Sequence, residues 1–138
     1  MPIGAPDPAT LGPLARKVLE YSDVMERTVE AAKQPGFSDS GWDELTGLID
    51  TAKFERVGND KAVMGWDVYR GLLTGWATTT DFRSEFHRIS EAGNCVFLEL
   101  TEHNTPLGGA ESVVNSLSLY DYDGNEKLIR LQIYLQHD

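Results

Sequence analysis

The sequence predicts an α+β fold in which three N-terminal helices pack on a curved, mainly antiparallel sheet, giving a cone-shaped domain. Apolar residues recur at helical spacing through the first half of the chain, from Leu14 to Ala32 and again from Trp66 to Trp76. From Asp81 onward the pattern changes to a period of two, which is typical of strands. Helices that precede a run of strands bury their apolar faces against the sheet, and a helix-covered concave sheet often encloses a ligand cavity.

The chain begins with a proline-rich segment and a long amphipathic helix. Three prolines among the first ten residues predict a flexible tail without regular structure over residues 1–10. Residues 11–138 are expected to form a single domain, because this length is close to the commonest domain size. Helical spacing predicts the first helix between Leu14 and Ala32, and the Pro35-Gly36 pair then ends it.

Two shorter helices and one short strand are expected before the main sheet. Ser40 is expected to cap the second helix, with Asp43 three residues later as a weak capping box. The buried side of that helix would be formed by Trp42, Leu45, Leu48 and Ile49. Alternation over Lys53–Val57 predicts a short strand, and the third helix follows over Trp66–Trp76.

Four long strands are expected in the second half. Short turns separate them, which favours an antiparallel meander over Phe82–Ile89, Cys95–His103, Glu111–Tyr122 and Lys127–Gln136. In the last strand the residues expected to face the core are Ile129, Leu131, Ile133 and Leu135. In the strand before it, Val113, Leu117 and Leu119 are expected to face the core, and a change of phase between Leu119 and Tyr120 predicts a bulge.

Composition and charge exclude several classes of function. The net charge is −10 and the 12 basic residues are scattered, so neither nucleic acid nor an anionic membrane is an expected partner. No apolar stretch approaches the roughly 18 residues that a membrane span needs. Cys95 is the single cysteine, and the first ten residues lack the basic start of a signal peptide, so a cytoplasmic location is expected.

Three polar residues interrupt faces that are otherwise apolar. Arg56 shares a strand face with Phe54, Glu102 follows three apolar residues in phase, and Asn115 lies in the middle of its strand. Burying such groups unpaired costs several kcal/mol, so each needs a protein partner, a water or a ligand. Arg56 and Glu102 could instead reach solvent at strand ends or pair with each other, and Asn115 could be a satisfied core amide.

Histidines and expected pocket residues complete the candidate site. His87 falls on the more polar side of its strand and is either a surface residue or a catalytic base. The three histidines, which include His103 and His137, do not recur with other ligands at metal-binding spacing, so neither a metal nor a cofactor is expected. The side chains expected to bind a small apolar ligand are Tyr21, Met25, Phe54, Trp76, Leu117 and Leu135.

Two local patterns resemble a known superfamily. One is Phe54-Glu55-Arg56-Val57 followed by Trp66-Asp67-Val68-Tyr69, and the other is Leu119–Gly124 followed by Leu128–Leu135. With the order of elements, they resemble the nuclear transport factor 2-like superfamily over residues 11–136. This superfamily includes ketosteroid isomerases, limonene-epoxide hydrolases and SnoaL-like polyketide cyclases. Because the fold hosts many activities, the resemblance implies the architecture more strongly than the reaction.

The resemblance also carries expectations about single residues. Arg56 stands at the position of the isomerase's general base, an aspartate, and Arg is not a base at neutral pH. Ser118 falls near the isomerase's protonated acid, and a bulge would bring Asn115 or Leu117 there instead. Tyr21 is the only tyrosine on the helix that carries the isomerase's oxyanion tyrosine.

Two functions are consistent with these features. The first is a cofactor-independent isomerase, cyclase or lyase that acts on an apolar, polycyclic or terpenoid substrate. Glu102 keeps a carboxylate of the epoxide-hydrolase triad and His87 matches the strand histidine of dehydratase-like relatives, so either would be the base. Arg56 and Asn115 would polarise a carbonyl or stabilise an enolate. The second is a non-catalytic ligand-binding or homodimeric assembly module, with an outer sheet face formed by Ser116, Ser118, Tyr120 and Tyr134.

Overall fold

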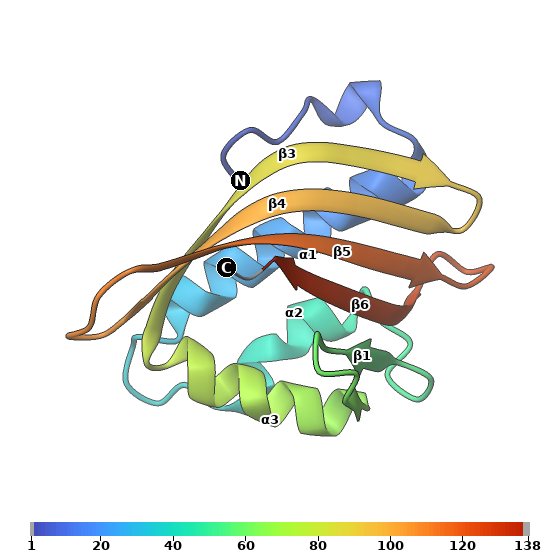
Figure 1. The fold of residues 1–138 in the computed structure, drawn as a ribbon. Helices are drawn as coiled ribbons and strands as arrows, with labels where there is room; N and C mark the ends of the chain where they lie inside the picture. Colours follow the sequence, from blue (N-terminus) through green and yellow to red (C-terminus); the bar gives the residue numbers. More distant parts are fainter. Residues whose placement is uncertain (1, 137–138) are drawn as a thin grey trace.

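The computed structural model describes residues 2–136 and shows an α+β fold with a mixed, open sheet of six strands (Figure 1). His137 lies outside the described residues. The helical elements are η1 (Pro8–Thr10), α1 (Pro13–Ala31), η2 (Asp39–Trp42), α2 (Asp43–Thr46) and α3 (Trp66–Ala77). The strands are β1 (Glu55–Val57), β2 (Val63–Met64), β3 (Thr80–Ala92), β4 (Cys95–Pro106), β5 (Ser112–Tyr122) and β6 (Leu128–Gln136).

Strand β1 pairs the helical first half of the chain with β6, the last strand of the meander. The order in the sheet is β2-β1-β6-β5-β4-β3, and β1 pairs with β6 in parallel, with Arg56 opposite Leu131. The four long strands form the expected antiparallel meander. Strand β2 was not expected, because two residues are too short to show alternation. The figure shows the long strands curving across α1, with α2 and α3 beyond β6 (Figure 1).

Bulges decide which residues face the helices. The register between β3 and β4 shifts between Phe86 and Arg88, so His87 is the extra residue, and a second shift lies between Asp121 and Tyr122. The expected bulge between Leu119 and Tyr120 is absent, since the pairing of β5 with both neighbours is continuous there.

The predicted inner face of β5 is wrong. Ser116, Ser118, Tyr120 and Tyr122 are buried against the core, whereas Val113, Leu117 and Leu119 alternate with them on the other face. By contrast, the predicted inner positions Leu131, Ile133 and Leu135 of β6 are confirmed by their place in the cavity described below. The predicted inner position Ile129 is wrong, because Ile129 is the extra residue at the second register shift and Leu128 is buried in the core instead.

The N-terminus of helix α1 is capped by a carboxylate that is distant in sequence. Gly12 precedes the helix without a side-chain cap, and the Ala15 amide instead donates to Glu91 Oε1 on β3 at 2.8 Å. A Cβ atom at position 12 would lie 2.7 Å from that same oxygen, so a larger residue there would displace the Glu91 carboxylate from its capping position. This contact fixes α1 on the end of β3, because a carboxylate stabilises the amides and the positive end of a helix dipole.

We predict that Glu91→Ala lowers the free energy of unfolding by roughly 0.5–2 kcal/mol, the usual cost of losing a helix cap. Urea denaturation followed by circular dichroism measures this change. Glu30, exposed near the other end of α1, gives the matched control Glu30→Ala, which is expected to be neutral. Equal effects of the two substitutions would contradict the capping role.

The N-terminal residues contain regular structure, contrary to the expectation drawn from the prolines. The Ile3 amide donates to the Ser84 carbonyl at 3.1 Å and the Phe86 amide donates to the Ile3 carbonyl at 2.7 Å, which makes a parallel bridge to β3. Asp7 then caps η1 through the Ala9 amide. These residues cover part of the β3 edge, an arrangement that shields unpaired backbone groups.

The second helix also differs from its prediction. Ser40 lies inside the 3₁₀ turn η2, and its hydroxyl lies 3.0 Å from that of Ser38 rather than capping a helix. The predicted burial of Trp42, Leu45 and Ile49 is confirmed, although the helix ends before Ile49. No helix of the described residues is both long and apolar enough to cross a membrane.

Candidate functional site

A cavity of about 360 Å³ lies between the inner face of the sheet and helices α1 and α3. This volume is within the range of small-molecule sites. Its apolar lining includes Met25, Leu73, Trp76, Leu100, Ile133 and Leu135. Its polar lining includes Tyr21, Arg56, Tyr69, Glu102, Ser118 and Tyr120. The cavity thus combines an apolar body with a few convergent polar groups, as ligand sites do.

Arg56 brings a positive charge into this apolar space. Strand β1 holds its backbone between Leu131 and Met64, and its guanidinium carbon lies 5.5 Å from the centre of the Tyr69 ring. Its Nε atom is shielded from solvent without a hydrogen-bond partner. Among the described residues no carboxylate lies within 4.0 Å of the guanidinium, so the expected pair with Glu102 does not form as a direct contact.

Among the described residues, Glu102 is the acidic side chain that lines the cavity. Burial raises the pKa of Glu102 above that of an ordinary glutamate, while the Ser116 hydroxyl and the Arg56 charge oppose the rise. A carboxylate that loses hydration in this way becomes a stronger base toward a bound molecule. Glu102 therefore has the environment of a general base, and Arg56 is near enough to influence its charge.

Three buried tyrosines lie beside these charges. The rings of Tyr21 and Tyr120 meet edge to face with centroids 5.5 Å apart. Burial raises the pKa of Tyr21, Tyr69 and Tyr120 above the ordinary tyrosine value, so all three hydroxyls stay protonated at neutral pH. The Tyr21 hydroxyl is shielded from solvent, and its polar neighbour is the Tyr69 side chain, toward which it acts as the donor. A ligand oxygen in the cavity competes with Tyr69 for this donor.

Of the two aromatic residues Phe54 and Trp76, both expected to contact a ligand, only Trp76 lines the cavity. Phe54, expected to contact the ligand, instead packs behind Tyr69 in a stacked arrangement with centroids 5.9 Å apart and does not line the cavity. Trp76 does line it, with its indole donating to Asn104 Oδ1 at 3.1 Å. The exposed Leu72 of α3 also lines the cavity, so this side is accessible from solvent.

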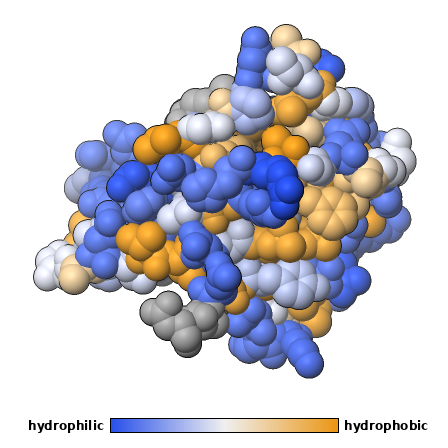
Figure 2. Space-filling view, turned by 45° about the horizontal axis from the view of Figure 1, so that its top comes forward, coloured by the Kyte–Doolittle hydropathy of each residue, from blue (hydrophilic) through white to orange (hydrophobic). Residues whose placement is uncertain are grey.

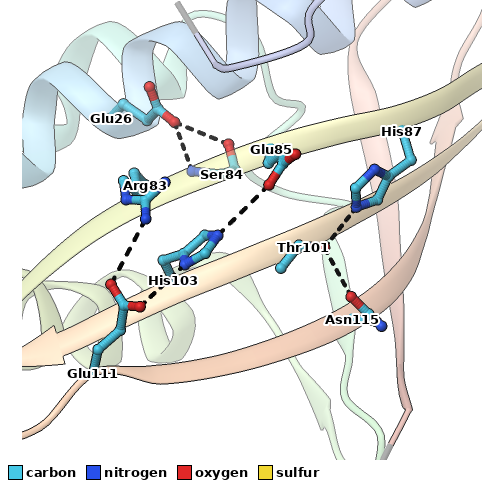
Figure 3. Close-up of polar contacts among 9 residues, drawn as sticks. All are labelled: Glu26, Arg83, Ser84, Glu85, His87, Thr101, His103, Glu111 and Asn115. Atoms are coloured by element: carbon cyan, nitrogen blue, oxygen red, sulfur yellow. Dashed lines mark hydrogen bonds and ion pairs between the residues drawn. The ribbon is translucent and has the colours of Figure 1, made fainter.

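His87 and Asn115 lie on the opposite face of the sheet. His87 Nε2 is 2.6 Å from the Thr101 hydroxyl, which donates to Asn115 Oδ1 at 2.8 Å (Figure 3). With Leu117 they line an open depression of about 620 Å³ on the outer surface. Thus the predictions that Asn115 and Leu117 reach the inner pocket are wrong, and of the two alternatives for β5 it is Ser118 that lines the cavity.

Charged residues share this outer face. His103 lies between Glu85 and Glu111, at 3.8 and 3.5 Å, and Arg83 is 3.8 Å from Glu111 (Figure 3). The Arg83–Glu111 contact is a surface ion pair, which contributes little stability. Within residues 2–136 no group of three His, Cys, Asp or Glu side chains is placed to hold a metal ion.

The structure therefore brings together about half of the predicted site. Tyr21, Met25, Arg56, Trp76, Glu102 and Leu135 line one cavity. Tyr69 and Tyr120 were not predicted as site residues. Tyr69 had been assigned to the apolar stripe of its helix, and Tyr120 to the outer face. A tyrosine on an apolar stripe is a signal that could have been used, because a buried hydroxyl needs a partner.

Comparison with solved structures identifies the architecture. An NTF2-like protein of unknown function from Exiguobacterium sp. 255-15 superposes with a TM-score of 0.69 and 13% identity, over 88% of this chain and 99% of that one. A SnoaL-like polyketide cyclase from Agrobacterium tumefaciens str. C58 gives 0.67 and 19%, over 91% and 93%. The chain has the nuclear transport factor 2-like fold.

A third structure with the nuclear transport factor 2-like fold is a hypothetical protein from Catenulispora acidiphila DSM 44928, in complex with trimethylamine. It is described as having a ketosteroid isomerase-like fold and gives a TM-score of 0.59 and 17% identity, over 86% of this chain and 83% of that one. No family model and no curated protein matches the sequence. At these identities the likeness concerns the fold, which was predicted from the order of elements and is confirmed.

Glu102 gives a pH-dependent stability prediction within this nuclear transport factor 2-like cavity. The pKa of Glu102 is raised in the folded state, so folding favours the protonated carboxyl. The free energy of unfolding is therefore highest below the pKa of glutamate in the unfolded chain. It falls as the pH rises through the pKa of Glu102 in the folded protein, where the buried carboxyl ionises. Glu102→Gln removes the ionisation. We expect the free energy of unfolding of the variant to be higher by roughly 0.5–2 kcal/mol at about pH 7, the usual gain of a single stabilising substitution.

The same variant is expected to show no gain at about pH 3.5, below the ordinary pKa of glutamate, where the wild-type carboxyl is protonated. Urea denaturation at both pH values measures the difference. Glu99→Gln, on the outer face of the same strand, is the control. An equal gain at both pH values would show that burial of the charge is not the cause.

Proposed function

We propose that this protein is a cofactor-independent enzyme of the isomerase, cyclase or lyase kind that acts on an apolar small molecule in the inner cavity. The observation that supports it is the presence of Glu102, Arg56 and the Tyr21 hydroxyl on one apolar cavity. A base, a positive charge and a protonated donor are the groups needed to make and hold an enolate. Two structural neighbours are described as SnoaL-like polyketide cyclases, which agrees with this class.

The proposed chemistry begins with proton transfer to Glu102. Its carboxylate removes a proton from a carbon next to a carbonyl, and the electron pair of the broken C–H bond moves onto the carbonyl oxygen. Tyr21 donates a hydrogen bond to that oxygen, and the Arg56 charge lies close by. Returning the proton from Glu102 to another carbon of the enolate system is isomerisation. Loss of a β-hydroxyl group, which takes the proton from Glu102 and leaves as water, is dehydration. Attack of the enolate carbon on a second carbonyl carbon of the same molecule, whose oxygen receives the electron pair and then the proton from Glu102, is cyclisation.

This proposal revises the expected catalytic set. His87 and Asn115 are replaced by Tyr21 as the partner of Glu102, because they line the outer depression and not the cavity. In this proposal residues 11–138 form one cone-shaped domain that is located in the cytoplasm. Burial raises the pKa of Cys95 to about 11, so at neutral pH its thiol is not the nucleophile of the proposal.

Binding and proton exchange test the enzyme proposal. A thermal-shift screen over steroids, terpenoids and aromatic polyketides finds ligands, and stabilisation is expected to be lost in Leu100→Arg, which fills the cavity. Hits and the simple ketone 2-tetralone are then incubated in D₂O, and exchange of the protons next to the carbonyl is followed by NMR. Exchange that depends on Glu102 supports the proposal, and its absence for every bound ketone would refute it.

A second candidate function is homodimeric assembly through the outer face of the sheet. Phe97, Val113 and Tyr134 project from it with exposed fractions of 38%, 55% and 51%. Figure 2 shows hydrophilic residues in a band across this side, with hydrophobic residues in separate patches. The residues predicted for the interface must be corrected, because Ser116, Ser118 and Tyr120 point inward and only Tyr134 lies outside.

We predict a dimer by light scattering that Val113→Asp converts to a monomer, since a buried unpaired charge is costly at an apolar contact. Val68→Asp is the matched control, because Val68 is 61% exposed on α3, away from the outer sheet face. A wild-type monomer at high protein concentration would exclude this assembly.

A further inference from the structure

The cavity contains a single positive charge in a strongly acidic protein. Among the described residues, Arg56 is the only basic side chain that lines it and Glu102 is the only acidic one. The chain has a net charge of −10, so its overall field repels anions. Any preference of the cavity for an anion must therefore come from Arg56 itself.

The guanidinium is held in place without using its hydrogen-bonding capacity on a carboxylate. Both neighbours of β1 pair with its backbone, and Tyr69 supports one face of the side chain. Gly58 leaves room for it, since a Cβ atom there would lie 2.6 Å from Arg56 Nη1. The nearby Asp60 Oδ1 accepts the Ala62 amide instead. An arginine fixed in this way is suited to a planar anion, which it binds through two parallel hydrogen bonds.

We infer that the substrate is an apolar carboxylic acid, with its carboxylate on Arg56 and its hydrocarbon body against Met25, Leu100 and Trp76. This inference rests on the proposed function and adds the substrate class. It separates two roles, because Arg56 anchors the carboxylate while Tyr21 serves the carbonyl oxygen. A phosphate ester fits less well, since phosphate sites gather several donors and Arg56 is the one cation that lines this cavity among residues 2–136.

Matched ligands test the inference. Isothermal titration calorimetry compares 2-naphthylacetate with 2-naphthylacetamide, which has the same shape and no charge. We expect the acid to bind wild-type protein about tenfold or more tightly than the amide, as a charge-assisted contact requires. In Arg56→Gln the ratio is expected to fall to about one. Arg130→Gln, an exposed arginine of β6, is expected to keep the wild-type ratio.

Several outcomes would overturn the inference. Equal affinities for acid and amide in wild-type protein would do so, as would an acid preference that persists in Arg56→Gln or tighter binding of 2-naphthyl phosphate than of the acid. If Arg56→Gln unfolds, Arg56→Lys keeps the charge without the planar fork, and its ratio is expected to lie between wild type and one.

The two proposals can fail separately. Acid-selective binding without Glu102-dependent proton exchange would support the carboxylate-binding site and refute the proposed enzyme activity. Proton exchange on neutral ketones without acid selectivity would keep the enzyme and remove the carboxylate site.

Discussion

Glu102→Gln is expected to lower the turnover of a responsive substrate by about 10²–10⁴-fold, the usual contribution of a positioned general base. Glutamine keeps the shape of the side chain and cannot accept the proton. Substrate affinity is therefore expected to stay within a few-fold of wild type, and the loss to appear in kcat. The readout is the rate of proton exchange or isomerisation under saturating substrate.

Two control variants test whether the loss of turnover is specific to Glu102. Glu99→Gln changes the same residue type on the same strand, where the side chain pairs with Arg88 on the outer surface. His87→Ala removes the other candidate base. Both variants are expected to keep wild-type turnover. Loss of activity in His87→Ala with retention in Glu102→Gln would reverse the assignment.

The dependence on pH gives an independent check. Because burial raises the pKa of Glu102, kcat/KM is expected to rise with pH through a value above that of an ordinary glutamate. A rate that is flat across this region would mean that another group takes the proton.

Trp42→Ala is expected to lower the free energy of unfolding by about 3–5 kcal/mol, as do other large-to-small changes of buried aromatic residues. Trp42 is fully buried, and its indole donates to the Thr74 hydroxyl at 3.0 Å. That hydroxyl donates in turn to Asp39 at 2.6 Å, and Phe37 meets the indole edge to face. The substitution therefore leaves a cavity and also removes one of the hydrogen bonds between η2 and α3.

Denaturation by urea, followed by circular dichroism, measures this loss. Trp42→Phe keeps most of the buried volume without the indole N–H, so its cost is expected to be smaller. Domains of this kind have about 5–15 kcal/mol of stability in total, so the alanine variant is expected to be marginally folded. A loss below about 1 kcal/mol would contradict the packing described for Trp42.

Long periodic segments were predictable from the sequence. Helices α1 and α3 and the four long strands lie where the periods of 3.6 and two indicate them. The inner positions Leu131, Ile133 and Leu135 of β6 were also predictable, because apolar and polar residues alternate along that part of the strand. Ile129 was not, because the register shift at the start of β6 buries Leu128 instead. In each case burial of one face, repeated over many residues, leaves a periodic record in the sequence.

Strand β5 shows why the rest was not predictable. The rule that apolar residues face inward places Leu117 inside and Ser118 outside, and the structure has the reverse. The rule fails because the inner face here borders a cavity that takes polar side chains, while the outer face carries apolar ones. The spacing around Arg56 also gives no indication that β1 pairs with β6, because parallel pairing of distant segments has no local signal.

The pairing of β1 with β6 has a consequence for synthesis of the chain. Arg56 leaves the ribosome well before its strand partner Leu131. Contacts this distant in sequence form late, since their loop must close first. Until β6 docks, β1 has only the two residues of β2 beside it. The nascent chain can therefore assemble α1 on β3 and β4 before β6 holds Arg56 in its place in the cavity lining.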